Sequence, residues 1–171
     1  MFEPLDASSW KEFFFTIAAA SAALIGLIVV GLSIHADYIA GSLTHRSHAR
    51  ATLVVLTATM AIGLVALFPQ EPAWAGWEIG LISLGFASIN TYNNTKALRQ
   101  VAWRLPRAAW QRMAVGYAIA ASGLIGAVSI VTGAGQVGGL YWIGLETIAA
   151  LVWAIAGAWR FLIGVVDEQR P

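Results

Sequence analysis

The chain contains no cysteine among its 171 residues. This absence excludes disulfide bonds, thiolate nucleophiles and cysteine-held metal clusters, and it leaves the redox compartment open. Charged residues are also scarce, at 11% of the chain, whereas a soluble globular domain carries about 25%. So few charged side chains cannot cover a water-facing surface. Together with a hydrophobic content of 58%, this scarcity predicts an integral membrane protein with lipid as its main solvent.

Five long apolar stretches occupy most of the chain, and each has about the length that crosses a bilayer as a helix. They cover residues 13–34, 51–68, 73–89, 113–132 and 140–166. Because a strand isolated in lipid would leave its backbone groups without hydrogen bonds, all five are expected to be helices. The sequence therefore predicts an all-α integral membrane protein, a bundle of five transmembrane helices that forms a single domain over residues 1–171.

Positive charge is concentrated on one side of these spans. Nine basic residues lie in the segments that five spans would place on the same side: Arg46, Arg50, Lys96, Arg99, Arg104, Arg107, Arg112, Arg160 and Arg170. Only Lys11 falls on the opposite side. An excess of Lys and Arg marks cytoplasmic segments, so the N-terminus is expected outside and the C-terminus inside. The acidic start of the chain is unlike a secretory signal, so the first span is expected to stay in the mature protein.

The longest basic segment, residues 90–112, is expected to form an inner loop. It mixes tryptophan and aliphatic side chains with four arginines, Arg99, Arg104, Arg107 and Arg112. Such a mixture is typical of a segment that lies on the surface of an anionic leaflet. The alternative interpretation is an ordinary basic loop that follows the charge rule and binds nothing.

Small residues recur every four positions in three of the spans, which places them along one helix face. The stripes comprise Ala18, Ala22 and Gly26 in the first span, Ala114, Ala118, Ser122 and Gly126 in the fourth, and Ala150, Ala154 and Ala158 in the fifth. Because lipid tails supply no hydrophobic drive between helices, close backbone approach at small residues favours their association. The stripes predict tight contacts, either within one chain or between subunits.

Glu146 is the strongest candidate for a functional residue. It lies about two turns inside the fifth span and continues the alanine stripe, so its carboxyl group is expected to face protein or a cavity. A carboxyl group inside the bilayer is costly and marks a functional site by default. The alternative is a hydrogen-bonded packing residue near the outer membrane surface.

Three further polar residues are candidates for the same permeation or gating path. Glu12 and Glu78 share the outer half of the membrane with Glu146, and Asn90 lies at the inner mouth of the third span. Carboxylates gathered in this way select cations in channels. Each of the three also has a structural alternative. Glu12 completes a capping box, Glu78 meets the positive end of a helix dipole, and Asn90 ends a helix.

No catalytic, metal or cofactor site is predicted. His35, His45 and His48 are interpreted as solvated loop histidines, since none has a ligand partner at helical spacing inside the bilayer. No Ser-His-Asp, metal-carboxylate or glycine-rich phosphate signature occurs, so an enzyme is not expected. No cofactor and no nucleic-acid partner is expected either.

The first span opens with tryptophan and two phenylalanines at 10–14, has a small-residue centre at 18–27, and ends in Val-Gly-Leu-Ser-Ile at 30–34. In these residues the chain resembles a family of small actinobacterial membrane proteins, some of which are labelled modulators of a membrane-bound protease. The resemblance covers mainly the first two spans. It implies a multi-pass protein of a bacterial plasma membrane and nothing catalytic.

Two classes of function follow as hypotheses. The leading one is a small channel-like homo-oligomer that conducts cations or protons past Glu146, since self-association would provide the pathway that one small bundle lacks. The competing one is a non-catalytic accessory subunit that modulates a larger membrane complex through its helix faces and basic inner loop. A simple transporter is the third reading.

Overall fold

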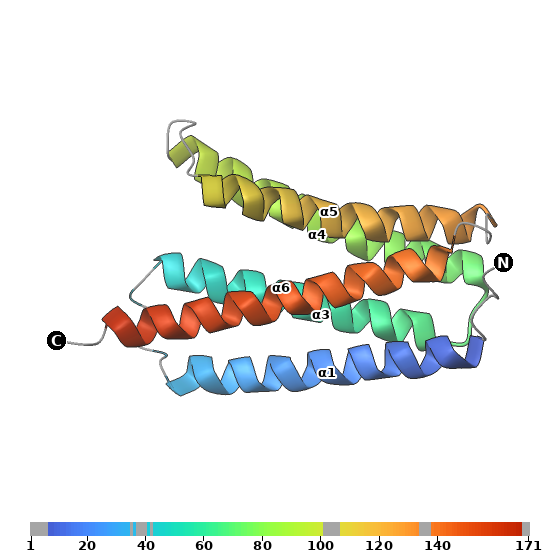
Figure 1. Cartoon of the computed structure of the whole chain (residues 1–171), viewed down its shortest axis with the longest axis horizontal. Helices are drawn as coiled ribbons and strands as arrows, with labels where there is room; N and C mark the ends of the chain where they lie inside the picture. The colour runs from blue at the N-terminus through green and yellow to red at the C-terminus, as the bar shows by residue number, and fades with distance from the viewer. Residues whose placement is uncertain are drawn as a thin grey trace. The chain divides into compact units, whose positions relative to one another are not determined.

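The structure is a computed structural model and describes residues 7–34, 36, 41, 43–100, 107–133 and 138–168. Regular structure within these ranges is helical throughout, which confirms the all-α prediction (Figure 1). The helices are α1 (Ala7–Ile34), α3 (Leu43–Leu67), α4 (Pro72–Gln100), α5 (Arg107–Val131) and α6 (Gly139–Glu168).

Four of these helices are long and apolar enough to cross a membrane. The apolar stretches are Trp10–Ile34, Ala49–Leu67, Met113–Val131 and Gly139–Trp159. They fit a multi-pass membrane protein. The remaining helix, α4, holds the third predicted span, 73–89, and its Glu78 and Asn90 lower its hydropathy. The number of five spans therefore stays a prediction.

The structure differs from the sequence prediction over the basic segment 90–112. Residues as far as Gln100 continue α4, and α5 already begins at Arg107, so most of this predicted loop is helical. Asn90 ends the apolar stretch but not the helix. Hydropathy reports where a helix meets lipid, whereas the helix itself needs only its backbone hydrogen bonds. For the same reason, His45 and His48 lie in α3 and not in the loop that the sequence predicted.

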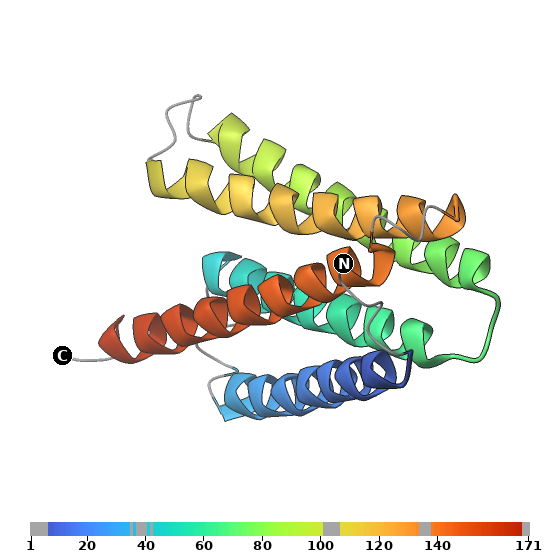
Figure 2. The same cartoon turned by 45° about the vertical axis from the view of Figure 1, so that its right-hand side comes forward.

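The chain divides into two compact units. Unit 1 comprises Met1–Leu67 with Thr147–Pro171, and unit 2 comprises Phe68–Glu146. In unit 1, α1 and α3 lie side by side and run in opposite directions (Figures 1 and 2). They approach closely at Gly63 of α3, where an added Cβ would lie 3.1 Å from both the Cβ of Ala18 and the backbone oxygen of Phe14.

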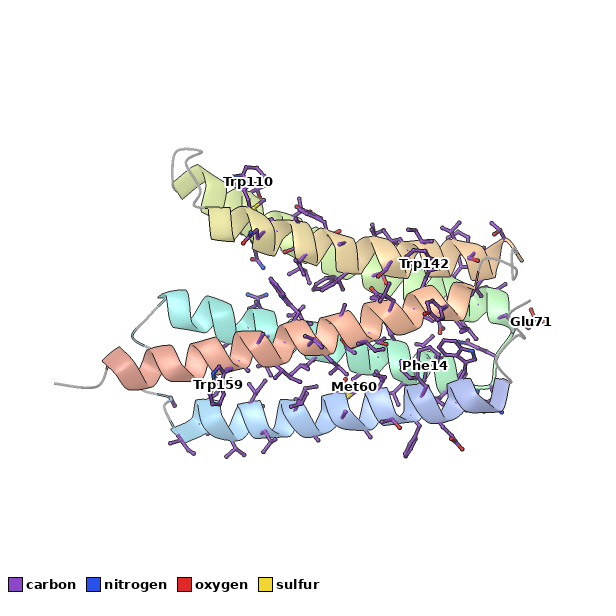
Figure 3. The ribbon with its side chains drawn as sticks, in the orientation of Figure 1. Phe14, Met60, Glu71, Trp110, Trp142 and Trp159 are labelled. Atoms are coloured by element: carbon purple, nitrogen blue, oxygen red, sulfur yellow. The ribbon has the colours of Figure 1, made fainter. Side chains whose placement is uncertain are left out.

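The aromatic start of α1 has a packing role in unit 1. The ring of Phe14 is 1% exposed and lies between α1 and α3 (Figure 3). Trp10 stacks on it with ring centroids 5.8 Å apart, and Phe13 meets it edge to face at 5.1 Å. Aromatic pairs in these two geometries stabilise each other beyond their buried area. The tryptophan and two phenylalanines noted in the sequence thus form an aromatic cluster at the start of α1, with Phe14 buried.

In unit 2, α4 and α5 lie side by side and antiparallel along most of their length (Figures 1 and 2). Gly76 near the start of α4 packs against the end of α5. A Cβ added to Gly76 would lie only 2.8 Å from Cγ2 of Val131. Asn90, two heptads later, packs against Gly116 near the start of α5. Gly133, just after the end of α5, and Gly138, just before α6, each have a φ of 69°, a left-handed backbone conformation that glycine adopts readily.

Candidate functional site

The candidate site lies in unit 2 and is built around the carboxyl group of Glu146, near the start of α6. The Glu146 side chain is only 3% exposed. Its one polar side-chain partner among the described residues is Ser83 of α4, which is fully buried. The Ser83 hydroxyl donates to Oε1 at 2.9 Å and also lies 3.2 Å from Oε2. The geometry joins α4 and α6 through a single hydroxyl group.

Gly123 of α5 provides the space that this carboxyl group occupies. A Cβ added to Gly123 would overlap both oxygens and the carboxyl carbon of Glu146. Three helices therefore contribute three different parts: a hydrogen-bond donor from α4, a gap without a side chain from α5, and the acid itself from α6. The first turn of α6 also packs closely against α5. A Cβ added to Gly126 of α5 would lie 2.8 Å from the backbone oxygen of Gly139 in α6.

The electrostatics of this site follow from its burial. A charged carboxylate deep in helix packing loses its hydration, and one neutral hydroxyl donor does not replace it. No described basic side chain forms an ion pair with Glu146. Among the described residues, its side-chain hydrogen-bond donor is the Ser83 hydroxyl. Among the described side chains, none balances the charge that an ionised Glu146 would carry.

Polar side chains continue from this site along the contact between α4 and α5. Asn90 lies seven residues after Ser83, and Gly116 lies seven residues before Gly123. A Cβ at Gly116 would lie 2.7 Å from Nδ2 of Asn90, so the amide fills a second gap in α5. Seven residues are two helical turns, which separates the two polar positions by about 10 Å.

A third polar contact lies beside the Asn90 position. The Tyr117 hydroxyl of α5 donates to Oγ1 of Thr91 in α4 at 3.1 Å, and Thr91 itself donates to the backbone oxygen of Ala87 at 2.8 Å. We call Glu146, Ser83, Asn90, Thr91 and Tyr117 the polar seam. It runs along one side of unit 2 from the start of α6 towards the basic end of α4.

The other predicted carboxylates lie outside the polar seam. Glu78 is exposed and accepts a hydrogen bond from Nε2 of Gln70 at 2.9 Å, so the structure does not bring it to Glu146 within unit 2. Glu12 is exposed in unit 1, where its backbone oxygen accepts a hydrogen bond from Thr16. Ser9, three residues before Glu12, is the residue that would complete a capping box with it, and its side chain lies outside the described side chains.

The stripe predicted in the fourth span is only half buried. Ser122 and Gly126 are buried, whereas Ala114 and Ala118 are exposed. A step of four residues advances about 40° beyond a full turn, so three such steps move around the helix by about 120°. The buried contacts of α5 instead follow steps of seven, as in a left-handed helix pair. In the fifth span, Ala150 and Ala154 are buried and Ala158 is partly exposed.

The arginines of the predicted basic loop are only partly described. Arg99 lies in α4, and Arg107 and Arg112 lie in α5, but their side chains are outside the described part of the chain. Arg104 and His35 also lie outside the described residues. Across the described ranges, no three His, Cys, Asp or Glu residues are grouped closely enough to hold a metal ion.

Sequence reasoning missed two essential parts of this site, Ser83 and Gly123. The available signal was a spacing of seven in both helices: Gly76, Ser83 and Asn90 in α4, and Gly116 and Gly123 in α5. Comparison with known proteins finds no matching family model, no matching curated protein and no matching solved structure. The geometry of unit 2 is therefore the basis for inferring a function.

Proposed function

We propose that the protein is a small, oligomeric, channel-like membrane protein that conducts protons, with Glu146 on the conduction path. The observation that carries the proposal is the buried carboxyl group of Glu146, held by the Ser83 hydroxyl in the gap at Gly123. A carboxyl group without a described counter-charge, in the middle of apolar helices, is a candidate binding site for a proton or a cation.

The tight packing favours a proton over a metal cation as the conducted ion. The Glu146 carboxyl group fills the gap at Gly123, and among the described residues it belongs to no group of three His, Cys, Asp or Glu side chains that could hold a metal ion. A sodium or potassium ion needs several oxygen ligands in place of its water shell. A proton needs only the carboxyl oxygen and a chain of hydrogen-bonding groups, which the polar seam supplies in part.

The proposal includes five spans with the N-terminus outside and the C-terminus inside. The α4–α5 contact supports a spanning α4, because it extends from Gly76 beside Val131 to Asn90 beside Gly116. This contact covers nearly the whole apolar stretch of α5, so α4 accompanies a spanning helix across that depth. The Glu78 and Asn90 side chains then lie towards opposite membrane surfaces.

Self-association is part of the proposal, because one chain of this size has little room for a full pathway. The bacterial plasma membrane implied by the first-span resemblance is part of it too. Helix faces rich in large apolar side chains are available for either lipid or a second copy, as at Leu81 and Val128.

The test is proton flux through liposomes that contain the purified full chain, with a pH-sensitive dye inside and a potassium diffusion potential as the driving force. The wild-type chain should acidify or alkalinise the lumen faster than empty liposomes. Glu146→Gln should lower the flux to background, since the amide keeps the shape and the Ser83 hydrogen bond but carries no exchangeable carboxyl proton. Glu78→Gln, the matched control at an exposed glutamate, should conduct like the wild type. Wild-type flux at the background level would contradict the proposal.

The close packing of Glu146 also favours a second candidate, an accessory subunit of a larger membrane complex. In that case the Ser83–Glu146 hydrogen bond would serve only to fix α4 against α6. Such a subunit should co-purify with a specific partner from its native membrane, and substitution of Arg99, Arg104, Arg107 or Arg112 should weaken that association. Full proton flux from the purified chain alone would set this candidate aside.

A further inference from the structure

Apolar side chains cover the Glu146 site on the side that faces the start of α4. About one turn before Glu146 along α6 lies Ile143, which is fully buried. A Cβ added to Gly126 of α5 would lie 2.7 Å from Cγ1 of Ile143, so this side chain packs directly on the α5 backbone. On α4, Ile79 lies about one turn before Ser83 and is 1% exposed. Two packed isoleucines thus lie at the level just beyond the carboxyl group.

A second apolar layer lies about one turn farther from the carboxyl group. Its central residue is Ile130 of α5, seven residues after Gly123. A Cβ added to Gly139 of α6 would lie 2.7 Å from Cγ1 of Ile130, and a Cβ added to Gly76 of α4 would lie 3.2 Å from its Cγ2. Ile130 therefore packs against both α4 and α6 at positions where each helix carries glycine. We call the three isoleucines the apolar plug: Ile79, Ile130 and Ile143.

The equivalent position on the other side of the site is polar. Seven residues after Ser83 along α4, the Asn90 amide fills the gap at Gly116 of α5. The seven-residue repeat therefore places an amide two turns from Ser83 in one direction and an isoleucine in the other. Ser129 is also buried in the isoleucine half, but six residues place it about 120° around α5 from Gly123. The polar seam thus leads away from the site in one direction only.

We propose that the apolar plug is a closed hydrophobic gate between Glu146 and the membrane surface at the start of α4. A constriction lined by large apolar side chains excludes water, and a proton does not pass it without water or another hydrogen-bonding group. Opening requires α4, α5 and α6 to separate at the plug far enough to admit water. The inference rests on the proposed proton conduction and adds the place where that conduction is controlled.

The test compares proton flux, in the liposome assay described above, among variants that shorten the plug. Ile143→Ala and Ile130→Ala should each conduct severalfold faster than the wild type, because each admits water where an isoleucine excluded it. Val128→Ala is the matched control and should conduct like the wild type, since Val128 lies in the same part of α5 and is 60% exposed. Each plug variant combined with Glu146→Gln should return to background, which separates a gated path from a nonspecific leak.

The outcomes distinguish the gate from the proposed function. Unchanged flux in the folded plug variants of a conducting protein would overturn the gate alone, and so would faster flux that survives Glu146→Gln. Background flux from the wild type and from every variant would overturn both. Flux in the plug variants alone, dependent on Glu146, would support the gate while contradicting conduction by the unmodified chain. Ile130 is only half-buried, so its variant keeps the test valid should Ile143→Ala fail to fold by circular dichroism.

Discussion

Replacing Gly123 by alanine should displace the Glu146 carboxyl group and destabilise unit 2. The added methyl group would overlap the carboxyl carbon and both oxygens of Glu146. These atoms are the end of a side chain, so they are able to swing away, but doing so breaks the hydrogen bond that Ser83 donates. The Gly123→Ala variant thus acts on the central contact of the site through a single carbon atom.

The magnitude follows from two contributions. Overpacking a well-filled helix contact costs about 1–3 kcal/mol of unfolding free energy. The lost hydrogen bond lies within that range, since side-chain hydrogen bonds between membrane helices average about 0.6 kcal/mol. Because the displaced atoms belong to a side chain and not to the backbone, we expect Gly123→Ala to lower the unfolding free energy by about 1–2 kcal/mol. Glu146→Ala should remove this penalty, so Gly123→Ala in that background should be nearly neutral.

The assay is reversible unfolding of the purified chain in mixed micelles with increasing SDS, followed by circular dichroism. Gly85→Ala is the matched control, because Gly85 lies in α4 of the same unit and a Cβ there meets nothing within 4 Å. It reports the change in helix propensity without a steric contact. A clash between the Gly123 methyl group and Glu146 is excluded if Gly123→Ala is as stable as Gly85→Ala, or if its loss of unfolding free energy persists unchanged in the Glu146→Ala background.

Three further variants test other contacts of unit 2 by the same SDS unfolding. Ser83→Ala should lower the unfolding free energy by about 0.6–1.7 kcal/mol, whereas Ser88→Ala, whose exposed hydroxyl bonds only within α4, should change it by less. Gly126→Ala should cost about 1–3 kcal/mol, because its Cβ would press on the backbone oxygen of Gly139, which cannot rotate away. Ala120→Leu should destabilise by a similar amount, whereas Ala118→Leu on the exposed face should be tolerated within about 0.5 kcal/mol. Equal effects at positions 118 and 120 would contradict the assigned face of α5.

The sequence predicted the helices well but not where they end. Apolar stretches identified the parts of α1, α3, α5 and α6 that suit lipid, since hydropathy measures that property directly. The polar ends of α3 and α4 escaped prediction because their helical hydrogen bonds leave no trace in hydropathy. Side chains there assist the helix locally, as where Thr95 donates to the backbone oxygen of Tyr92.

The candidate site was predicted in part. The cost of a carboxyl group in lipid was enough to single out Glu146 and to expect its side chain inside protein. The free-energy cost of placing a polar group in lipid did not identify its partner, because a lone serine such as Ser83 is tolerated on any helix face. Only the pairing of α4 with α5 selects it. The stripe of small residues at four-residue spacing from Ala114 to Gly126 does not coincide with the α4–α5 contact, since that contact follows a repeat of seven. Contacts of Ala114 and Ala118 between subunits stay a prediction.

In the proposed function, the Glu146 carboxyl group, packed between Ser83 and Gly123, takes up and releases a proton. Infrared difference spectroscopy of the full chain in lipid bilayers, recorded across a step in pH, measures this directly through the carboxyl C=O stretch. A C=O band should appear with protonation and vanish in Glu146→Gln. In Ser83→Ala it should shift in frequency, because the hydroxyl donor is lost. A wild-type spectrum without a C=O change that depends on Glu146 would contradict this proton uptake.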